Sequence, residues 1–193
     1  METLFENGIR TLLTFKATHS DNSNMNWNAM VVNDDNNLDG VLTESEIYLN
    51  MYLRGMYNYK NILTFVLHKN DATYLYLCRY DLDDFCFYGI YYRLNEESKT
   101  YTKCGYVKLN TWCVTTPDSL EKMNKIIEIT DFFENQIYPK NKKIIKNMSG
   151  FNIANVDLLI KDLDKERNNI NKAFKVPKNE LYVRRKKERN VVL

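Results

Sequence analysis

Apolar and polar positions alternate over much of the first 115 residues, and a period of two is the pattern of β-strands with one buried face. The clearest run covers residues 46–54, in which Ile47, Leu49 and Met51 share one face and polar or aromatic residues share the other. Further runs of this kind are predicted to be strands over residues 8–17, 25–32, 61–68, 73–80, 85–94 and 100–109. The first part of the chain is therefore predicted to form a β-sheet.

The later runs are joined by short polar links at residues 69–71, 81–84 and 95–98. Links of this length connect antiparallel neighbours as hairpins. We therefore expect an antiparallel β meander of about six to eight strands, arranged as a sandwich or an open barrel.

The period changes after residue 115, where a helix is predicted. Thr116 can cap its N-terminus, with Pro117 at the first helical position. Apolar residues then recur at helical spacing until Pro139, which ends the pattern. They are Leu120, Met123, Ile127, Phe133 and Ile137.

A second helix is predicted over residues 156–174, with Asn155 as its cap. Its apolar stripe consists of Leu159, Ile160, Leu163, Ile170 and Phe174. The fold class is therefore α+β, with two C-terminal helices and a basic tail after the meander. The expected division is a β body over residues 1–115, a helical segment packed on it over 116–174, and the tail over 175–193.

The charge of the chain is unevenly distributed, although the formal net charge is only +2. Residues 1–138 contain 12 Lys and Arg against 19 Asp and Glu, a charge of −7, and residues 139–193 contain 15 against 6, a charge of +9. Two clusters hold most of the excess: Lys140, Lys142, Lys143 and Lys146, and then Arg184, Arg185, Lys186, Lys187 and Arg189. Such clusters bind phosphates or act as nuclear import signals. The simpler alternative is a tail that is solvated, or that docks on the acidic β body of its own chain or of a copy.

Residues 35–46 resemble the calcium-binding loop of EF-hand proteins. The side chains that would bind the ion are those of Asp35, Asn37, Asp39 and Glu46. Gly40 would make the sharp turn of that loop. An EF-hand continues into a helix, however, whereas the residues after this loop alternate as a strand. A polar turn between two strands explains residues 33–40 more simply, and we expect no tight calcium binding.

Carboxylates on two predicted turns are the best candidates for catalysis. They are Asp81, Asp83 and Asp84 on one turn and Glu97, followed by Ser98 and Lys99, on the next. Their order resembles the D…ExK pattern of metal-dependent nucleases, in which carboxylates bind Mg²⁺ and the lysine stabilises charge. Two hairpin loops at one end of a meander would place the same acids there for solubility alone. A nuclease is therefore the third hypothesis for this chain.

Cysteine and histidine patterns do not predict a metal site or a cofactor. The four cysteines are Cys78, Cys86, Cys104 and Cys113. They lie in strand-like segments without a CxxC pair, so we expect reduced and mostly buried thiols. The two histidines are His19 and His68, and His68 adjoins a predicted turn, where we expect it to be exposed. No glycine-rich phosphate loop is present, and no cofactor is expected.

Composition limits the class and the location of the protein. Hydrophobic residues make up 44% and charged residues 27%, which is ordinary for a folded chain. The 25 Asn, 19 Lys and 14 Tyr are typical of proteins from AT-rich genomes, such as those of many large DNA viruses, some cytoplasmic plasmids and some protozoa, so a viral protein is one of the origins that the composition allows. No apolar run reaches about 18 residues, so no membrane-spanning helix is expected. Glu2 and Glu6 precede the first apolar stretch, unlike in a secretory signal, so we expect a nuclear or cytoplasmic protein.

These observations favour a non-enzymatic binding or regulatory protein. It would contact nucleic acid or an acidic protein surface through the basic C-terminal segment. The alternative is a protein-interaction or assembly component, in which an oligomer would form through the tyrosine-rich sheet. The salt dependence of binding to random-sequence nucleic acid would separate these hypotheses.

Overall fold

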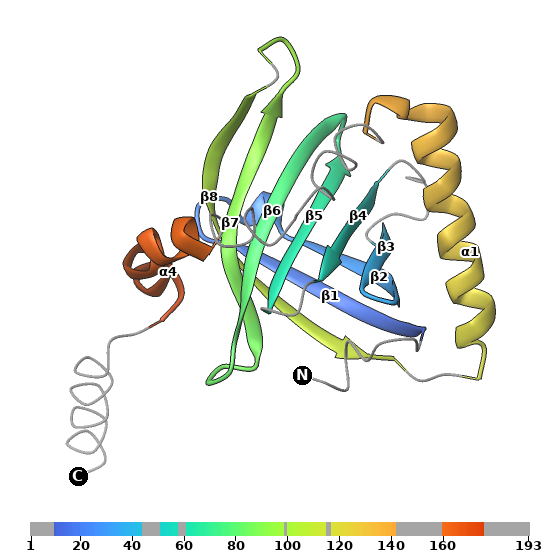
Figure 1. The fold of residues 1–193 in the computed structure, drawn as a ribbon, viewed down its shortest axis with the longest axis horizontal. Coiled ribbons are helices and arrows are strands. Elements are labelled where there is room, and N and C mark those ends of the chain that lie inside the picture. The colour runs from blue at the N-terminus through green and yellow to red at the C-terminus, as the bar shows by residue number, and fades with distance from the viewer. Residues whose placement is uncertain are drawn as a thin grey trace.

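The computed structural model shows a β-barrel with helices on its outside (Figure 1). The described residues are 10–43, 51–57, 61–98, 100–114, 117–141 and 160–175. Several predicted features therefore lie outside the described residues, including the Thr116 cap, residues 44–50 and most of the basic tail.

Eight strands follow one another in sequence order, with one short 3-10 helix, η1 (Ser23–Met25), between the first two. The strands are β1 (Thr11–His19), β2 (Trp27–Asp34), β3 (Asn37–Leu42), β4 (Tyr52–Tyr57), β5 (Ile62–Lys69), β6 (Ala72–Asp81), β7 (Cys86–Asn95) and β8 (Thr100–Cys113). Each strand pairs antiparallel with the next, and β8 pairs with β1, so the sheet is a closed barrel. The α+β class and the antiparallel meander are confirmed.

The closure of the barrel is the feature that the local pattern does not reveal. In the pairing of β1 with β8, Leu13 lies opposite Cys113 and Phe15 lies opposite Thr111. Alternation along one strand shows which face is buried, but it does not show which distant strand will be its neighbour. The sequence therefore left a sandwich and an open barrel as choices, and the structure shows a barrel that is closed.

Strand β3 is missing from the sequence prediction. It follows β2 through the two-residue turn of Asp35 and Asn36, whose φ angles of 49° and 67° are left-handed. Two consecutive residues in that conformation make the tight hairpin turn that suits twisted strands, and Asp and Asn tolerate it. Because β3 contains Asp39 and Gly40, its sequence has few of the residues that favour strands.

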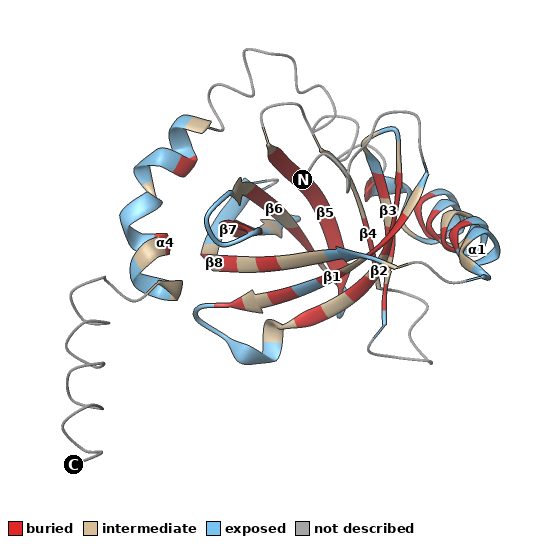
Figure 2. Ribbon diagram, turned by 90° about the horizontal axis from the view of Figure 1, so that it is seen from below, coloured by how far each residue is buried: buried red, intermediate tan, exposed pale blue. Residues whose placement is uncertain are grey.

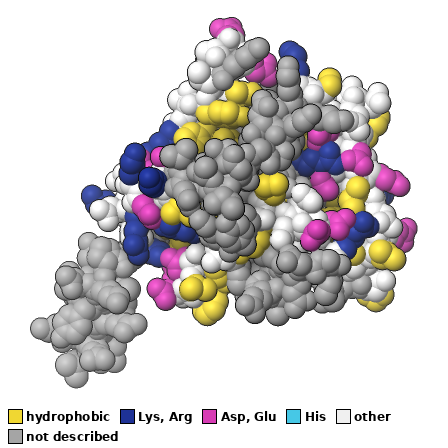
Figure 3. Space-filling model, viewed as in Figure 1, with side chains coloured by type: hydrophobic (Ala, Val, Ile, Leu, Met, Phe, Trp, Pro, Cys, Tyr) yellow, Lys and Arg dark blue, Asp and Glu magenta, His cyan; other side chains and the backbone are white. Residues whose placement is uncertain are grey.

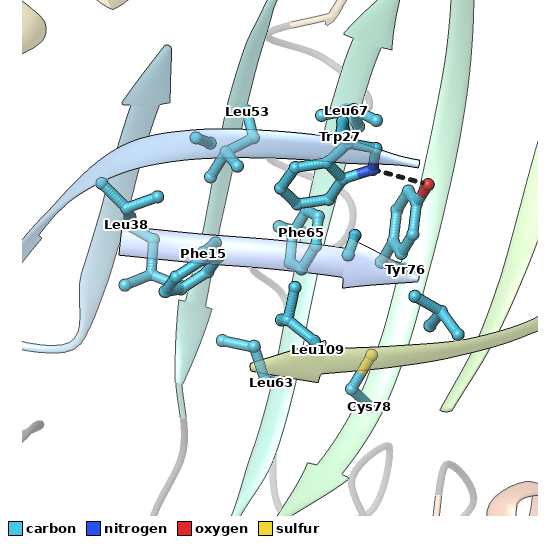
Figure 4. Packing of buried hydrophobic residues seen from close by; sticks show 14 of the residues in the cluster. Phe15, Trp27, Leu38, Leu53, Leu63, Phe65, Leu67, Tyr76, Cys78 and Leu109 are labelled. Carbon is cyan, nitrogen blue, oxygen red and sulfur yellow. Dashed lines mark hydrogen bonds between the residues drawn. The ribbon is translucent and has the colours of Figure 1, made fainter. Parts of the chain in front are cut away.

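Side chains fill the barrel interior. Alternate residues of every strand point inward, and the largest buried cluster spans all eight strands (Figure 4). At its centre the rings of Phe65 and Tyr76 stack with centroids 4.8 Å apart. Trp27 Nε1 donates a hydrogen bond to Tyr76 Oη at 3.0 Å. The indole and phenol groups thus satisfy each other inside an apolar core.

Helix α1 (Ser119–Phe132) and the π-helical turn η2 (Phe133–Ile137) lie against the outer face of β2, β3 and β4. The buried face agrees with the predicted stripe only in part, since Met123 and Phe133 are buried and Ile127 is partly buried, but Leu120 and Ile137 are exposed. Met123, Ile126 and Thr130 are buried, whereas Leu120 is 64% exposed. Ile126 and Ile127 are both apolar, so the helical period alone does not show which of them faces the barrel.

Arg54 on β4 joins α1 and η2 to the barrel. Its Nε atom donates to Asp39 Oδ1 at 2.6 Å, its Nη1 atom donates to Glu134 Oε2 at 2.5 Å, and its Nη2 atom donates to Asp131. Burial alone would lower the pKa of Arg54, but Coulombic attraction to Asp39 and the hydrogen bonds to all three carboxylates outweigh it and raise the pKa further above its ordinary value. The guanidinium group therefore stays charged and links two strands to both helical elements.

The second predicted helix is confirmed as a helical segment on another side of the barrel. Residues 160–165 are helical, and α4 (Arg167–Phe174) follows after one turn residue. Leu163 and Ile170 pack on outward-facing apolar residues of β5, β6 and β7, namely Ile62, Leu77 and Ile90. Figure 2 shows α1 and α4 on opposite sides of the barrel, each with its buried residues toward the strands.

Two expectations about polar side chains need correction. Cys78 and Cys86 are buried as expected and all four cysteines are free, but Cys113 at the end of β8 is exposed. His68 is only 5% exposed, although it adjoins a turn. Its ring lies against Tyr138, with centroids 3.9 Å apart, because the chain after α1 returns across the outer face of β5.

Two glycines at close strand crossings provide a test of the packing. A Cβ atom at Gly55 would lie 2.1 Å from the carbonyl oxygen of Thr64, and one at Gly89 would lie 2.0 Å from that of Leu77. Backbone cannot move away cheaply, so replacing either glycine with alanine should lower the free energy of unfolding by about 3 kcal/mol.

Urea denaturation of the two variants would measure this effect, with Gly40→Ala as the comparison. The nearest atoms to a Cβ at Gly40 are side-chain carbons of Leu53 and Val31 at 2.9 Å, which can shift. That variant should lose only about 1 kcal/mol. An equal loss in all three variants would contradict the close crossings.

Candidate functional site

The structure describes only one member of the two basic clusters. Lys140 is exposed on a short helical turn, residues 139–141, beyond η2. Its neighbour Asn141 anchors that turn by donating a hydrogen bond from Nδ2 to Tyr52 Oη at 2.9 Å. The others, Lys142, Lys143, Lys146, Arg184, Arg185, Lys186, Lys187 and Arg189, lie outside the described residues.

The residues of the calcium-like loop lie in the β2–β3 hairpin. Asp35 is in the turn, Asn37 begins β3 and Gly40 is inside that strand rather than at a turn. Asp39 accepts a hydrogen bond from Arg54 Nε at 2.6 Å. Glu46 lies outside the described residues. Within the part of the chain that the structure describes, no group of three or more His, Cys, Asp or Glu side chains is arranged to hold a metal ion.

The carboxylates of the nuclease-like pattern are not brought together. Asp81 ends β6 and Asp83 and Asp84 lie in the turn that follows it, whereas Glu97 belongs to the turn between β7 and β8. Successive turns of a meander lie at opposite ends of the strand that joins them, and β7 has 10 residues, a length of about 33 Å. The expectation that both loops lie at one end was wrong. Figure 1 shows the two turns at opposite ends of β7.

The tyrosine-rich strands do not present the exposed face that the interaction hypothesis needs. Tyr57, Tyr74, Tyr76, Tyr80 and Tyr91 belong to the barrel interior or pack against it. The outward-facing Tyr88, Tyr92 and Tyr106 pack with α4, and Tyr52 stacks on Phe133. Among the strand tyrosines that the structure describes, only Tyr101 is exposed, at 36%.

The outer face of β6, β7 and β8, together with α4, collects the remaining polar residues of interest. Glu166, just before α4, accepts hydrogen bonds from Tyr106 Oη at 2.5 Å, from Lys103 Nζ at 2.9 Å and from Asn169 Nδ2 at 3.0 Å. The bonds from Asn169, Tyr106 and Lys103 lower the pKa of Glu166 to about 2. This carboxylate therefore fixes the start of α4 on β8.

A row of lysines runs along the solvent side of this helical segment. Lys161, Lys165 and Lys172 are four and seven residues apart, so they share one face of a helix, opposite Leu163 and Ile170. All three are exposed, and none pairs with an acid within the part of the chain that the structure describes. We call these residues the lysine stripe. Figure 3 shows Lys and Arg side chains gathered over the position of α4.

The helical register across the turn residue supports the shared face. The Glu166 N–H donates to Asp162 O at 3.3 Å, and the Ile170 N–H donates to Glu166 O at 2.9 Å. Both are four-residue hydrogen bonds, so the period continues through residue 166. The stripe is easily missed in the sequence because the lysines and arginines are much denser in the clusters at 140–146 and 184–189. The spacing of 161, 165 and 172 was the available signal.

A groove of about 400 Å³ lies between α4 and the turn that joins β6 to β7. Side chains that line it include Arg79, Asp81, Tyr88, Arg167, Asn171 and Lys175. Lys175 Nζ lies 2.5 Å from Asp81 Oδ2 and 4.9 Å from the centroid of the Tyr88 ring. Arg79 pairs with Asp164 at 2.9 Å.

Charges inside the groove are largely balanced. Burial alone would raise the pKa of Asp81, but the hydrogen bond from Lys175 and those from the backbone N–H groups of Asp84 and Asp83 outweigh it, so the pKa is lowered. Arg167 is the exception among the basic side chains, because it is exposed and no acid pairs with it within the described ranges. Asp83 also lines the groove, so the formal charges of the lining sum to zero.

A second polar group lies inside the barrel, at the end covered by η1. Asn26 Oδ1 can only accept from the His19 ring, so in the neutral imidazole Nε2 accepts from Tyr76 Oη, 2.7 Å away, and the same Tyr76 oxygen accepts from Trp27. The proton of the imidazole is then on Nδ1, which donates to Asn26 Oδ1 at 3.2 Å. Burial outweighs the hydrogen bond to Asn26 and the nearby charge of Asp21, and lowers the pKa of His19 to about 4. This histidine is thus neutral and structural.

Comparison of the chain with models of known protein families, with curated proteins and with solved structures found no match. Of the helices in the described part of the chain, none is long and apolar enough to span a membrane.

The buried imidazole of His19 should make the fold sensitive to acid. Its pKa is about 4 in the fold against 6.5 when unperturbed. The unfolded state therefore binds the proton first, so stability is complete above pH 6.5 and falls as the pH decreases toward 4. Urea denaturation of wild type and His19→Gln at pH 7 and 4.5 should show a loss smaller by about 2 kcal/mol in the variant.

The control for this effect is His68→Gln. Burial also lowers the pKa of His68, so His68 adds its own loss of stability at acid pH. The variant removes that loss and keeps the loss that is due to His19. An identical loss of stability in wild type and His19→Gln would contradict the assignment.

Proposed function

We propose that this protein is a non-enzymatic binding protein that contacts the phosphate backbone of nucleic acid through its basic C-terminal third, with the barrel as a rigid support. The observation that carries the proposal is the lysine stripe. Lys161, Lys165 and Lys172 lie on the solvent side of a helix whose other side is packed on the barrel. Basic residues aligned along one helix face are the electrostatic signature of a nucleic-acid contact.

The stripe has the properties that a phosphate contact requires. Its ammonium groups are exposed and have no acidic partner among the described residues, so binding a phosphate breaks no ion pair. Each phosphate that a lysine neutralises releases condensed counterions, which makes the contact favourable at low salt and weak at high salt. Lysine acts here as a point charge and does not distinguish bases, so little sequence preference is expected.

The charge of the whole chain supports the same orientation. Residues 1–138 carry a formal charge of −7, and residues 139–193 carry +9. An acidic body repels a polyanion and a basic end attracts it, so the field would confine contact to the C-terminal side. The arginine- and lysine-rich run over residues 184–189 would add to that field, and its composition also suits a nuclear import signal.

The stripe can be tested with a matched pair of double variants. Lys165→Gln with Lys172→Gln should weaken binding to random-sequence DNA and RNA equally, and should reduce the slope of log affinity against log salt by about one to two. The control is Lys122→Gln with Lys125→Gln, which removes two exposed lysines from α1 on the other side of the barrel. Fluorescence anisotropy at two salt concentrations measures both affinity and slope.

The control should bind like wild type, and melting temperatures should be unchanged in both double variants. Absence of binding to either nucleic acid at low salt would refute the proposal and leave an acidic protein surface as the partner of the basic segment. Equal weakening by the two double variants would show that net charge, rather than this helix face, governs binding.

A further inference from the structure

The groove beside α4 runs next to the lysine stripe. Asp164, Arg167, Asn171 and Lys175 all line the groove, and their spacing of three to four residues puts them on one file of the helix. The lysine stripe follows the neighbouring file, about a quarter of the way round the helix. A strand that follows the stripe therefore passes the mouth of the groove.

Arg167 is a cation without an ion pair in a groove lining whose formal charges cancel overall, since Arg79, Arg167 and Lys175 are matched by Asp81, Asp83 and Asp164. Lys175 is paired with Asp81, and Arg79 with Asp164, so those two cations are already compensated. The exposed guanidinium of Arg167 has no acidic partner in the part of the chain that the structure describes. A planar guanidinium can bind a phosphate through two hydrogen bonds or lie flat on a base.

The turn on the opposite side of the groove contains an unusual residue just beyond the lining. Leu82 and Asp83 line the groove, and Phe85 closes the same turn by donating its N–H to Asp81 O at 2.9 Å. Phe85 is 75% exposed and has a φ angle of 54°. The left-handed region is costly for a bulky side chain such as that of phenylalanine. Because the ring is mostly exposed to water, its burial contributes little stability to offset that cost. The turn thus keeps an aromatic ring exposed at a cost in stability.

We propose that the groove holds one unpaired nucleotide of a single strand, with its base on Phe85 and its phosphate on Arg167. The idea rests on the proposed function, since the neighbouring phosphates lie along the lysine stripe. Asp81, Asp83 and Asp84 make the turn unfavourable for phosphate, so the part of the nucleotide that meets it is the base. Bases in a duplex are stacked and cannot reach Phe85, so the protein prefers single strands.

Phe85→Leu is the decisive variant, with Phe132→Leu as its control. Both rings are exposed, at 75% and 55%, but Phe132 is on α1. Anisotropy with a labelled 12-mer and its duplex should show wild type binding the single strand at least about fivefold more tightly. Phe85→Leu should bind the single strand more weakly and the duplex as before, so most of the preference should be lost. Base stacking is worth roughly fivefold or more in affinity. Phe132→Leu should keep it.

Arg167→Gln tests the other half of the site, with Arg93→Gln as its control. Arg93 is also exposed, on β7 near the opposite end of the barrel. Arg167→Gln should weaken single-strand binding roughly fivefold, and Arg93→Gln should leave the affinity for both the single strand and the duplex unchanged. Phe85→Gly should raise the melting temperature while it lowers the single-strand preference, since glycine adopts positive φ without strain.

The outcomes separate this inference from the proposed function. Equal binding of single strand and duplex by wild type, with the lysine double variant still weaker on both, would overturn the nucleotide site and leave the phosphate contact in place. A preference for single strands that survives both Phe85→Leu and Arg167→Gln would also overturn it. Absence of binding to either substrate would refute the proposed function itself.

Discussion

The pairing of β1 with β8 is the interaction on which the rest of the structure depends. It joins residues about one hundred positions apart, as Leu13 and Cys113 show, and it removes the last two free edges of the sheet. Bringing such distant strands together costs chain entropy before any contact is made. Burial of a core that spans all eight strands offsets that cost, and the core exists only when the barrel is closed.

Closure also determines where the helices can lie. A barrel buries one face of each strand, so any apolar residue on the outer face needs separate cover. Two such patches exist on opposite sides: Leu12 and Val32 under α1, and Ile62, Leu77 and Ile90 under α4. Hydrogen bonds and ion pairs of Arg54 hold α1 on the barrel, and those of Glu166 hold the start of α4. The described helical segment over residues 160–175 is therefore held at a definite place on the barrel.

The sequence predicts the strands best where the turns are short. The runs at 61–68 and 73–80 correspond within two residues to β5 and β6, because Asn70 and Asp71 form a tight left-handed turn between them. The sequence does not predict β3, where Asp39 and Gly40 lie in a strand because of their contacts with neighbouring strands. Asp39 pairs with Arg54, and the bare backbone of Gly40 lies close to Leu53 and Val31. Such tertiary contacts leave no local period.

The candidate site shows the same division between local and tertiary information. The spacing of Lys161, Lys165 and Lys172 could be read along the chain, since a helix was predicted there. The groove could not, because it joins α4 to a turn that precedes it by about eighty residues. Nor could the exposure of Phe85, which an apolar pattern assigns to the start of a buried strand.

Phe85 is the residue whose conformation most needs a reason. The non-glycine residues with positive φ in the described part of the chain are Asp35, Asn36, Asn61, Asn70, Asp71 and Phe85. All but the last are Asn or Asp, which tolerate that region because their short side chains can bond to nearby backbone. A position that departs from local preference and buries nothing in return adds no stability to its own fold. Phe85 belongs to the turn on one side of a groove whose other side presents the Arg167 guanidinium. A ligand that contacts both the exposed ring and that guanidinium would supply the interaction that the fold itself lacks.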